Sequence, residues 1–216
     1  MKTAAKLTSP IAYQVVTYLL THPTTTQLET SRQAGVSIGW VNAVIKTLED
    51  NHVIRRGKKS RLELVDPISL LDALAWERPL SRLRKTATPL EISNPQEAET
   101  ALAEICLKSK TRYALTGFAG LSRYLAYHIG YPTIHAYAAE NLIAESLPKG
   151  RGAVTIELFN PDYPSIFGHA QSHDGFSVVE PIQVVIDLYC LGSAGRDAAM
   201  KLYELTVLES AKTNPR

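Results

Sequence analysis

The chain has 216 residues, of which 45% are hydrophobic and 20% charged, and its formal net charge is only +2. This is ordinary globular composition, with enough apolar material for one or two cores. It argues against a membrane-spanning protein, because no apolar run approaches the roughly 18–20 residues that cross a bilayer.

The charge is divided unevenly along the chain. Residues 1–92 hold 13 Lys and Arg against 8 Asp and Glu, whereas residues 93–216 hold 10 against 13. Opposite signs predict two units with different roles. Cys106 and Cys190 lie far apart without a CxxC spacing or a secretory signal. We therefore expect free thiols in a reducing cytosol, a cytoplasmic protein, and no metal or other cofactor.

Three helices are predicted first along the chain. Ser9 and Pro10 begin the first helix. Thr26 and Glu29 have the spacing of a capping box and begin a short second helix. Ser37 caps the third. The apolar face of the third helix consists of Val41, Val44, Ile45 and Leu48.

The connection between the second and third helices is only "AGVS", residues 34–37. Such a short link is typical of a helix-turn-helix. A β-hairpin follows, framed by apolar residues at 53–54 and 62–64 with Gly57 in its turn. Three helices and a basic hairpin predict a winged helix-turn-helix, and Asp66 then begins another helix.

The rest of the chain alternates between strand and helix patterns. Asn94 begins a helix, and Pro181 begins another directly after the strand pattern "FSVV". A short helix is predicted for residues 138–147 and a last one in "GRDAAMKLYELTVLES". Further strands are predicted in "RYALT", "PTIHAYA" and "GAVTIELF".

The predicted fold class is α+β, with two domains. Residues 1–78 form the winged helix-turn-helix, and residues 94–216 form a mixed α/β domain. Residues 79–93, interrupted by prolines, are the boundary, with a strand near Thr88–Ile92.

The hairpin carries five cations within seven residues and no acid among them. They are Arg55, Arg56, Lys58, Lys59 and Arg61. In a winged helix the third helix enters the major groove while the hairpin touches phosphates or the minor groove. Each phosphate that a cation neutralises releases bound counterion. The cluster therefore predicts binding to double-stranded DNA, although a merely solvated basic surface is the alternative.

The candidate groove-facing residues of the third helix are Ser37, Trp40, Asn42 and Lys46. Asn42 can pair bidentately with adenine, and Ser37 can bind a phosphate or a base edge. Gly39 keeps the helix slim, at a helix cost of roughly 1 kcal/mol relative to Ala. A core position for Trp40 is the alternative interpretation.

Other patterns that carry chemistry are incomplete. His169 and His173, followed by Asp174, lie between two glycines and predict a loop or hairpin rather than a metal site. The Gly turn "TGFAG" precedes a helix, in the order seen in nucleotidyltransferases, but the next strand "TIHAYA" lacks the paired carboxylates that hold Mg²⁺. Glu157 stands alone, and no complete GxGxxG, Walker or GxSxG pattern is present. We therefore predict no catalytic residues and no enzyme.

Two segments of the second domain, 113–124 ("YALTGFAGLSRY") and 174–192 ("DGFSVVEPIQVVIDLYCLG"), together with the predicted winged helix, carry a family resemblance. The chain resembles the AbiEi family of antitoxin-type transcriptional regulators from bacterial type IV toxin–antitoxin systems. The matching positions include Tyr113, Thr116, Gly117, Gln183 and Asp187.

The resemblance implies an operon repressor that binds inverted repeats in its own promoter. It also implies a second domain that counters a nucleotidyltransferase-like toxin. Packing and capping are the alternative roles for Tyr113, Thr116 and Asp187.

We therefore expect a DNA-binding transcriptional regulator of antitoxin type. One alternative is a nucleotide- or small-molecule-binding enzyme that uses the turn at Gly117 and Gly120. Another is a winged-helix adaptor that binds proteins rather than DNA.

Overall fold

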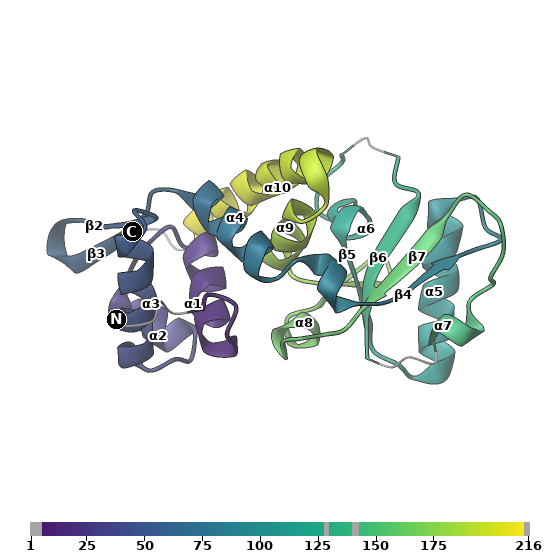
Figure 1. The fold of residues 1–216 in the computed structure, drawn as a ribbon, viewed down its shortest axis with the longest axis horizontal. Coiled ribbons are helices and arrows are strands. Elements are labelled where there is room, and N and C mark those ends of the chain that lie inside the picture. Colours follow the sequence, from purple (N-terminus) through teal and green to yellow (C-terminus); the bar gives the residue numbers. More distant parts are fainter. Residues whose placement is uncertain (1–5, 128–129, 140–142, 214–216) are drawn as a thin grey trace. The chain divides into compact units, whose positions relative to one another are not determined.

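The computed structural model describes residues 6–127, 130–139 and 143–213 (Figure 1). The described residues form two compact units. Unit 1 holds the residues up to Pro79 together with those from Tyr203 on, and unit 2 holds Leu80–Leu202. Both units combine helices with strands, so the α+β class is confirmed.

Unit 1 consists of helices and a small antiparallel sheet. Its helices are α1 (Pro10–Thr21), α2 (Gln27–Gln33), α3 (Ile38–Asp50) and α4 (Pro67–Glu77). Its strands are β1 (Thr24–Thr26), β2 (Ile54–Arg56) and β3 (Arg61–Leu64), in the order β1-β3-β2. Strand β1 has no counterpart among the predicted elements, because three threonines give no alternating pattern and the strand forms by pairing with β3.

Local sequence explains most of the helix starts in unit 1. Thr26 and Glu29 form both bonds of the predicted capping box, and Asp66 accepts a hydrogen bond from the backbone N–H of Ser69. Ser37 lies at the N-cap of α3, but its side chain makes no capping hydrogen bond. The predicted cap at Ser37 is therefore wrong in this detail, and its hydroxyl is not used by the helix.

Unit 2 is built on a six-stranded mixed sheet of order β4-β7-β6-β5-β9-β8. The strands are β4 (Arg84–Pro89), β5 (Tyr113–Thr116), β6 (Thr133–Ala138), β7 (Thr155–Phe159), β8 (Gln171–His173) and β9 (Phe176–Val178). The helices are α5 (Pro95–Ser109), α6 (Gly117–Leu121), α7 (Ile143–Ser146), α8 (Ser165–Gly168) and α9 (Pro181–Tyr189), and α10 (Gly192–Thr213) begins in this unit.

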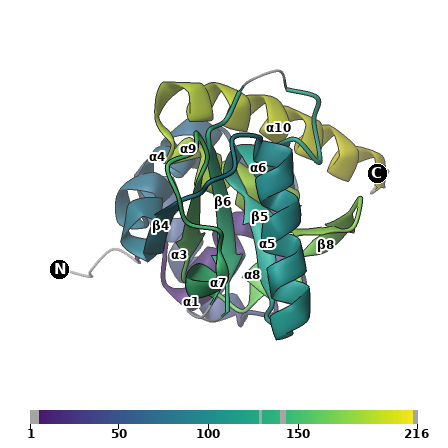
Figure 2. The same cartoon turned by 90° about the vertical axis from the view of Figure 1, so that its right-hand side faces the viewer.

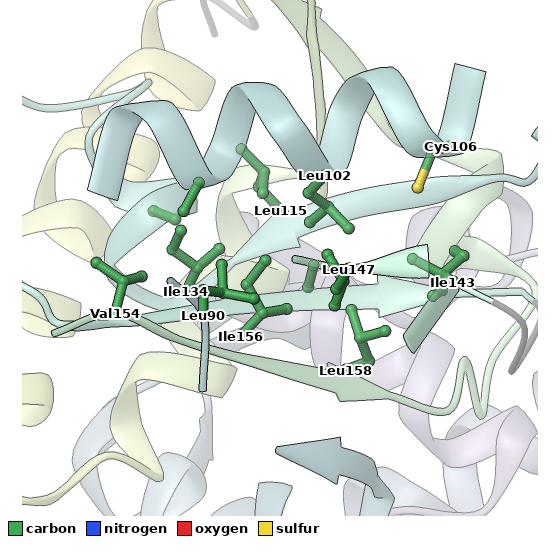
Figure 3. Packing of buried hydrophobic residues seen from close by; sticks show 14 of the residues in the cluster. Leu90, Leu102, Cys106, Leu115, Ile134, Ile143, Leu147, Val154, Ile156 and Leu158 are labelled. Carbon is green, nitrogen blue, oxygen red and sulfur yellow. The ribbon is translucent and has the colours of Figure 1, made fainter. Parts of the chain in front are cut away.

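Helices α5 and α9 lie on opposite faces of this sheet (Figures 1 and 2). On the α5 face, Leu102 packs in one apolar cluster with Leu115, Ile134 and Ile156 from three adjacent strands (Figure 3). Successive side chains of a strand point to opposite faces. The intervening residues therefore face α9, and several of them are polar.

The structure differs from the predicted boundary at residues 79–93. This segment contains β4, which pairs antiparallel with β7 and forms an edge of the sheet. Pro89 is tolerated at the end of β4 because an edge strand need not donate every backbone hydrogen bond.

The end of the chain also differs from the predicted second domain. The residues of α10 from Tyr203 on belong to unit 1, although the sequence pattern placed them in residues 94–216. Among the described residues, no helix combines the length and the apolar content needed to cross a bilayer.

Candidate nucleic-acid interface

The hairpin of β2 and β3 extends beyond the helices of unit 1 (Figure 1). A short 3₁₀ turn, Lys58–Ser60, connects its strands, and the turn closes with a hydrogen bond from the N–H of Gly57 to the carbonyl of Arg61. Arg55, Arg56, Lys58 and Arg61 are exposed. The side chain of Lys59 lies outside the described part of the structure. The predicted basic tip therefore faces solvent rather than folding inward.

Arg55 has a carboxylate partner that the local sequence does not suggest. The register of the hairpin sets Arg55 directly opposite Glu63. The guanidinium donates from Nε at 3.2 Å and from Nη2 at 2.5 Å to Glu63 Oε2. The carboxylate also lies over the turn, since a Cβ added to Gly57 would meet Glu63 Oε1 at 2.5 Å.

Arg56 has a second partner, which comes from α3. Its Nε lies 2.6 Å from Oε1 of Glu49. Ion pairs at such exposed positions contribute little to stability, roughly 0.2–1 kcal/mol each. These pairs still lower the positive electrostatic potential at the hairpin, because they neutralise two of the five predicted cations locally. Among the described residues, no carboxylate pairs with Lys58 or Arg61.

Helix α3 has the two faces that its sequence predicts. The buried stripe consists of Val41, Val44, Ile45 and Leu48. Trp40 is 51% exposed, so its alternative assignment to the core is wrong. Ser37, Asn42 and Lys46 are exposed as well. The four residues predicted to face a groove therefore lie on the accessible side of α3.

Asn42 is held in place by the preceding helix. Its Oδ1 accepts a hydrogen bond from Nε2 of Gln27 at the start of α2, at 3.0 Å. Amide groups joined in this way restrict each other's rotamers while each keeps further donors and acceptors. The contact therefore adds Gln27, which the sequence interpretation missed, to the accessible polar groups beside α3.

Three of the five residues that carry the family resemblance, Thr116, Gln183 and Asp187, meet in one buried cluster with Tyr137. Asp187 on α9 accepts hydrogen bonds from Thr116 at 2.7 Å, from Gln183 at 2.9 Å and from Tyr137 at 2.9 and 3.0 Å. These residues, the Asp187 cluster, are almost completely buried. Tyr113 lies apart, and its hydroxyl accepts from the N–H of Ser177 at 3.4 Å. The arrangement favours a packing role for the cluster, because solvent does not reach it.

The glycine turn of unit 2 is a packing element and cannot act as a phosphate cradle. Gly117 (φ +57°) lies against His135, whose Nδ1 would be 2.8 Å from an added Cβ. Gly120 lies against Val184 and the carbonyl of Leu115. Both glycines are buried, and helix α6 that follows has only five residues. The alternative of a nucleotide site at this turn therefore loses its basis.

His135 occupies a buried position in β6, next to the single carboxylate of β7. Its Nε2 lies 3.8 Å from Oε2 of Glu157, and Arg84 pairs with the other oxygen of Glu157 at 2.8 Å. Burial lowers the pKa of His135 to about 4, although Glu157 opposes this shift. The imidazole is therefore neutral near pH 7, and Arg84 balances the carboxylate of Glu157.

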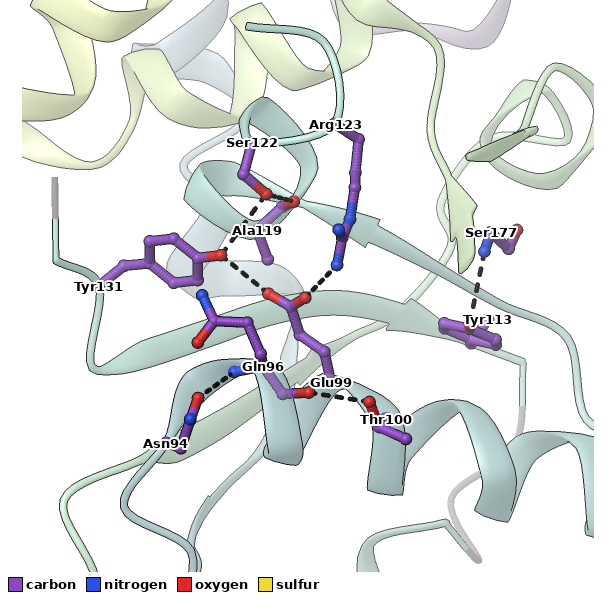
Figure 4. A network of polar contacts seen from close by, with 10 residues as sticks. All are labelled: Asn94, Gln96, Glu99, Thr100, Tyr113, Ala119, Ser122, Arg123, Tyr131 and Ser177. Atoms are coloured by element: carbon purple, nitrogen blue, oxygen red, sulfur yellow. Dashed lines mark hydrogen bonds and ion pairs between the residues drawn. The ribbon is translucent and has the colours of Figure 1, made fainter. Parts of the chain in front are cut away.

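A second polar network connects α5 to the segment after α6 (Figure 4). Glu99 is fully buried, forms an ion pair with Arg123 and accepts from the hydroxyl of Tyr131 at 3.0 Å. Burial raises the pKa of Glu99, and Arg123 opposes the rise. The guanidinium of Arg123 also lies over the ring of Phe176, 4.3 Å from its centroid.

A cavity of about 610 Å³ opens beside this network, between α5, α8 and the hairpin of β8 and β9. Its lining includes the rings of Tyr113, Phe167 and Phe176 and the cations Lys110 and Arg112. Cavities of this size that combine aromatic walls with a few polar groups are typical of small-molecule sites. Tyr113, one of the residues that carry the family resemblance, lines this cavity.

The two histidines considered as metal ligands lie on separate elements. His169 follows α8 and approaches Glu180 at 3.2 Å, whereas His173 ends β8 and packs edge-on against Tyr124. The positive φ angles of Asp174 and Gly175 form the tight turn of the predicted hairpin. The described residues hold no group of three or more His, Cys, Asp or Glu side chains suited to a metal ion.

Comparison of the chain with models of protein families, with curated proteins and with solved structures yields no match.

Proposed function

We propose that the protein is a transcriptional regulator that binds double-stranded DNA, and that unit 1 is a winged helix-turn-helix. The observation that carries the proposal is the exposed basic hairpin of β2 and β3 beside the accessible face of α3. A recognition helix reads base edges in the major groove, while cations on a projecting hairpin hold the phosphates. Unit 1 offers both surfaces.

The charges at the hairpin favour an electrostatic attraction of moderate strength to DNA phosphates. Of the five cations, Arg55 and Arg56 are paired with Glu63 and Glu49. Among the hairpin cations whose side chains are described, Lys58 and Arg61 have no carboxylate partner and supply the excess positive charge. Each phosphate contact changes the logarithm of the binding constant by about 0.9 per logarithmic unit of salt. With these two cations on phosphates, the hairpin should contribute a slope of roughly −1.8.

The role proposed for unit 2 is that of an AbiEi-type antitoxin domain, functionally paired with a nucleotidyltransferase-like toxin. Its basis is the resemblance at the Asp187 cluster, which ties β5, β6 and α9 together. Because the cluster is buried, its residues act by fixing the shape of unit 2. If the neighbouring gene encodes such a toxin, coexpression of the full chain should restore growth. Continued growth arrest despite expression of a folded chain would contradict this role.

The test of DNA binding is a titration of the full chain against a duplex of its upstream promoter, which should contain inverted repeats. Replacement of the five hairpin cations by Ala should weaken binding to any duplex and flatten its salt dependence. Replacement of Lys108 and Lys201 by Ala provides a control in unit 2. Unchanged affinity and slope in the hairpin variant would contradict the proposal. Absence of duplex affinity at low salt would favour the protein-binding adaptor.

A second candidate function is binding of a small molecule by unit 2, which the cavity beside Tyr113 favours. A bound ligand stabilises the folded state in proportion to its free concentration over its Kd. Thermal unfolding should therefore be measured with nucleotides, with and without Mg²⁺, and with aromatic carboxylates. A rise in Tm that is lost in a Phe167→Ala variant would support this function. A Tm that none of these compounds changes would count against it.

A further inference from the structure

The accessible face of α3 has an unusual chemical composition for a basic DNA-binding unit. Gly39, Ala43 and Lys46 lie opposite the buried stripe, as their helical spacing requires. Gly39 and Ala43 present almost no side chain, and an added Cβ at Gly39 would meet nothing within 4 Å. The backbone of α3 can therefore approach a surface closely at these two positions.

Large apolar side chains flank this slim centre. Ile38 is 53% exposed and Trp40 is 51% exposed, although both are hydrophobic and lie in the first turn of α3. The apolar group that a major groove offers is the C5 methyl of thymine, which Ala, Phe and other apolar side chains contact. Ile38 and Trp40 match that group in chemistry.

The polar groups of the same face favour adenine over guanine. Asn42 is the residue type that pairs bidentately with N6 and N7 of adenine, and Gln27 holds it at 3.0 Å. Guanine is read by arginine or lysine; α3 contains no arginine, and its first two turns contain no lysine. Lys46, the cation of this helix, lies one turn farther along.

We propose, resting on the DNA-binding function above, that α3 reads A·T base pairs, with Asn42 on adenine and with Ile38 and Trp40 on thymine methyl groups. The ligand class is duplex DNA whose half-sites are A·T-rich under the first turns of α3. This proposal explains why Ile38 and Trp40 are exposed, because they would contact bases in the groove. The competing outcome of the test is that these two residues form a docking surface for another protein.

The first experiment selects duplexes from a random pool with the full chain at low salt. We expect the selected sites to share A·T-rich half-sites. In one selected duplex, every thymine is then replaced by deoxyuridine, which removes the C5 methyl and keeps the base pairing. Affinity should fall about fourfold for each methyl that is buried, corresponding to ~0.8 kcal/mol per methyl-sized group.

The second experiment assigns the methyl contacts to residues. In Ile38→Ala and Trp40→Ala variants, the discrimination between thymine and deoxyuridine should shrink, because the contact is already lost. A Lys58→Ala variant is the matched control, since loss of a phosphate contact weakens both duplexes equally. All three side chains are exposed, and thermal unfolding of each variant verifies that it is folded.

The outcomes separate this inference from the proposed function. If the chain binds no duplex, the DNA-binding function fails and this inference fails with it. If the chain binds duplexes but selects G·C-rich sites, or binds thymine and deoxyuridine duplexes equally, the inference alone is overturned. Duplex binding that Ile38→Ala and Trp40→Ala leave unchanged would identify the apolar pair as a surface for another partner.

Discussion

Glu63→Gln should strengthen DNA binding, because it releases Arg55 from its internal partner. In the folded chain Glu63 lies opposite Arg55 across the hairpin and accepts two of its hydrogen bonds. Glutamine has nearly the same shape but no charge. The substitution therefore adds one unit of positive charge at the hairpin. Its cost in stability is small, since an exposed pair is worth roughly 0.2–1 kcal/mol.

The size of the effect follows from the number of free cations at the hairpin. Of the four hairpin cations whose side chains are described, Arg55 and Arg56 are paired, so Glu63→Gln raises the number without a carboxylate partner from two to three. One further phosphate contact steepens the salt slope by about 0.9. Between 50 and 200 mM salt, the variant should therefore lose about 3.5-fold more affinity than the native chain. At the low-salt end it should bind more tightly.

The assay is fluorescence anisotropy of a labelled duplex, titrated with protein at four salt concentrations. Glu97→Gln is the control, because it changes the net charge equally at an exposed carboxylate of unit 2. A slope that Glu63→Gln leaves unchanged, or that Glu97→Gln steepens equally, would refute the assignment of the hairpin as the phosphate-binding element. Equal steepening by Glu97→Gln would also show that total charge, rather than its position, governs binding.

Further predictions concern unit 2 and the centre of α3. Burial lowers the pKa of His135 from 6.5 to about 4, so within this interval the unfolded chain binds a proton that the folded chain does not. The His135 contribution to the free energy of unfolding should therefore be complete above pH 6.5 and fall by about 3 kcal/mol towards pH 4, and a His135→Gln variant should lack this part of the pH profile in urea titrations. Asp187→Ala removes the shared acceptor of its buried cluster and should lower the free energy of unfolding by about 3 kcal/mol. A decrease in this free energy of less than ~1 kcal/mol would show that the cluster does not stabilise the fold of unit 2. Gly117→Ala should cost more than Gly175→Ala in the same measurement, because both positions have positive φ angles but only the first has a neighbour within 4 Å of the added Cβ. Gly39→Ala should raise Tm, since Ala favours a helix by up to ~1 kcal/mol, and yet weaken duplex binding; equal or tighter binding would argue against a close approach at this glycine.

The elements that could be predicted from the sequence are those with local causes. The capping box at Thr26 and Glu29, the proline at the start of α5 and the apolar stripe of α3 are each decided by residues within a few positions of one another. The exposed face of α3 followed from the same periodicity, which is why Asn42 and Lys46 were placed correctly on it. Strand β1 and the edge strand β4 were missed or misplaced, because pairing partners distant in sequence create them.

The candidate site depends on both levels. The sequence by itself determined that five cations stand together on a hairpin and that α3 presents a slim, mostly uncharged face. Only the tertiary structure decided which cations are free, because the hairpin register sets Glu63 opposite Arg55 and helix packing brings Glu49 to Arg56. It also gathered Thr116, Tyr137 and Asp187 into one buried cluster. Charges and hydrogen bonds act through space over a few ångströms, so their partners are fixed by the folded chain and not by the order of residues along it.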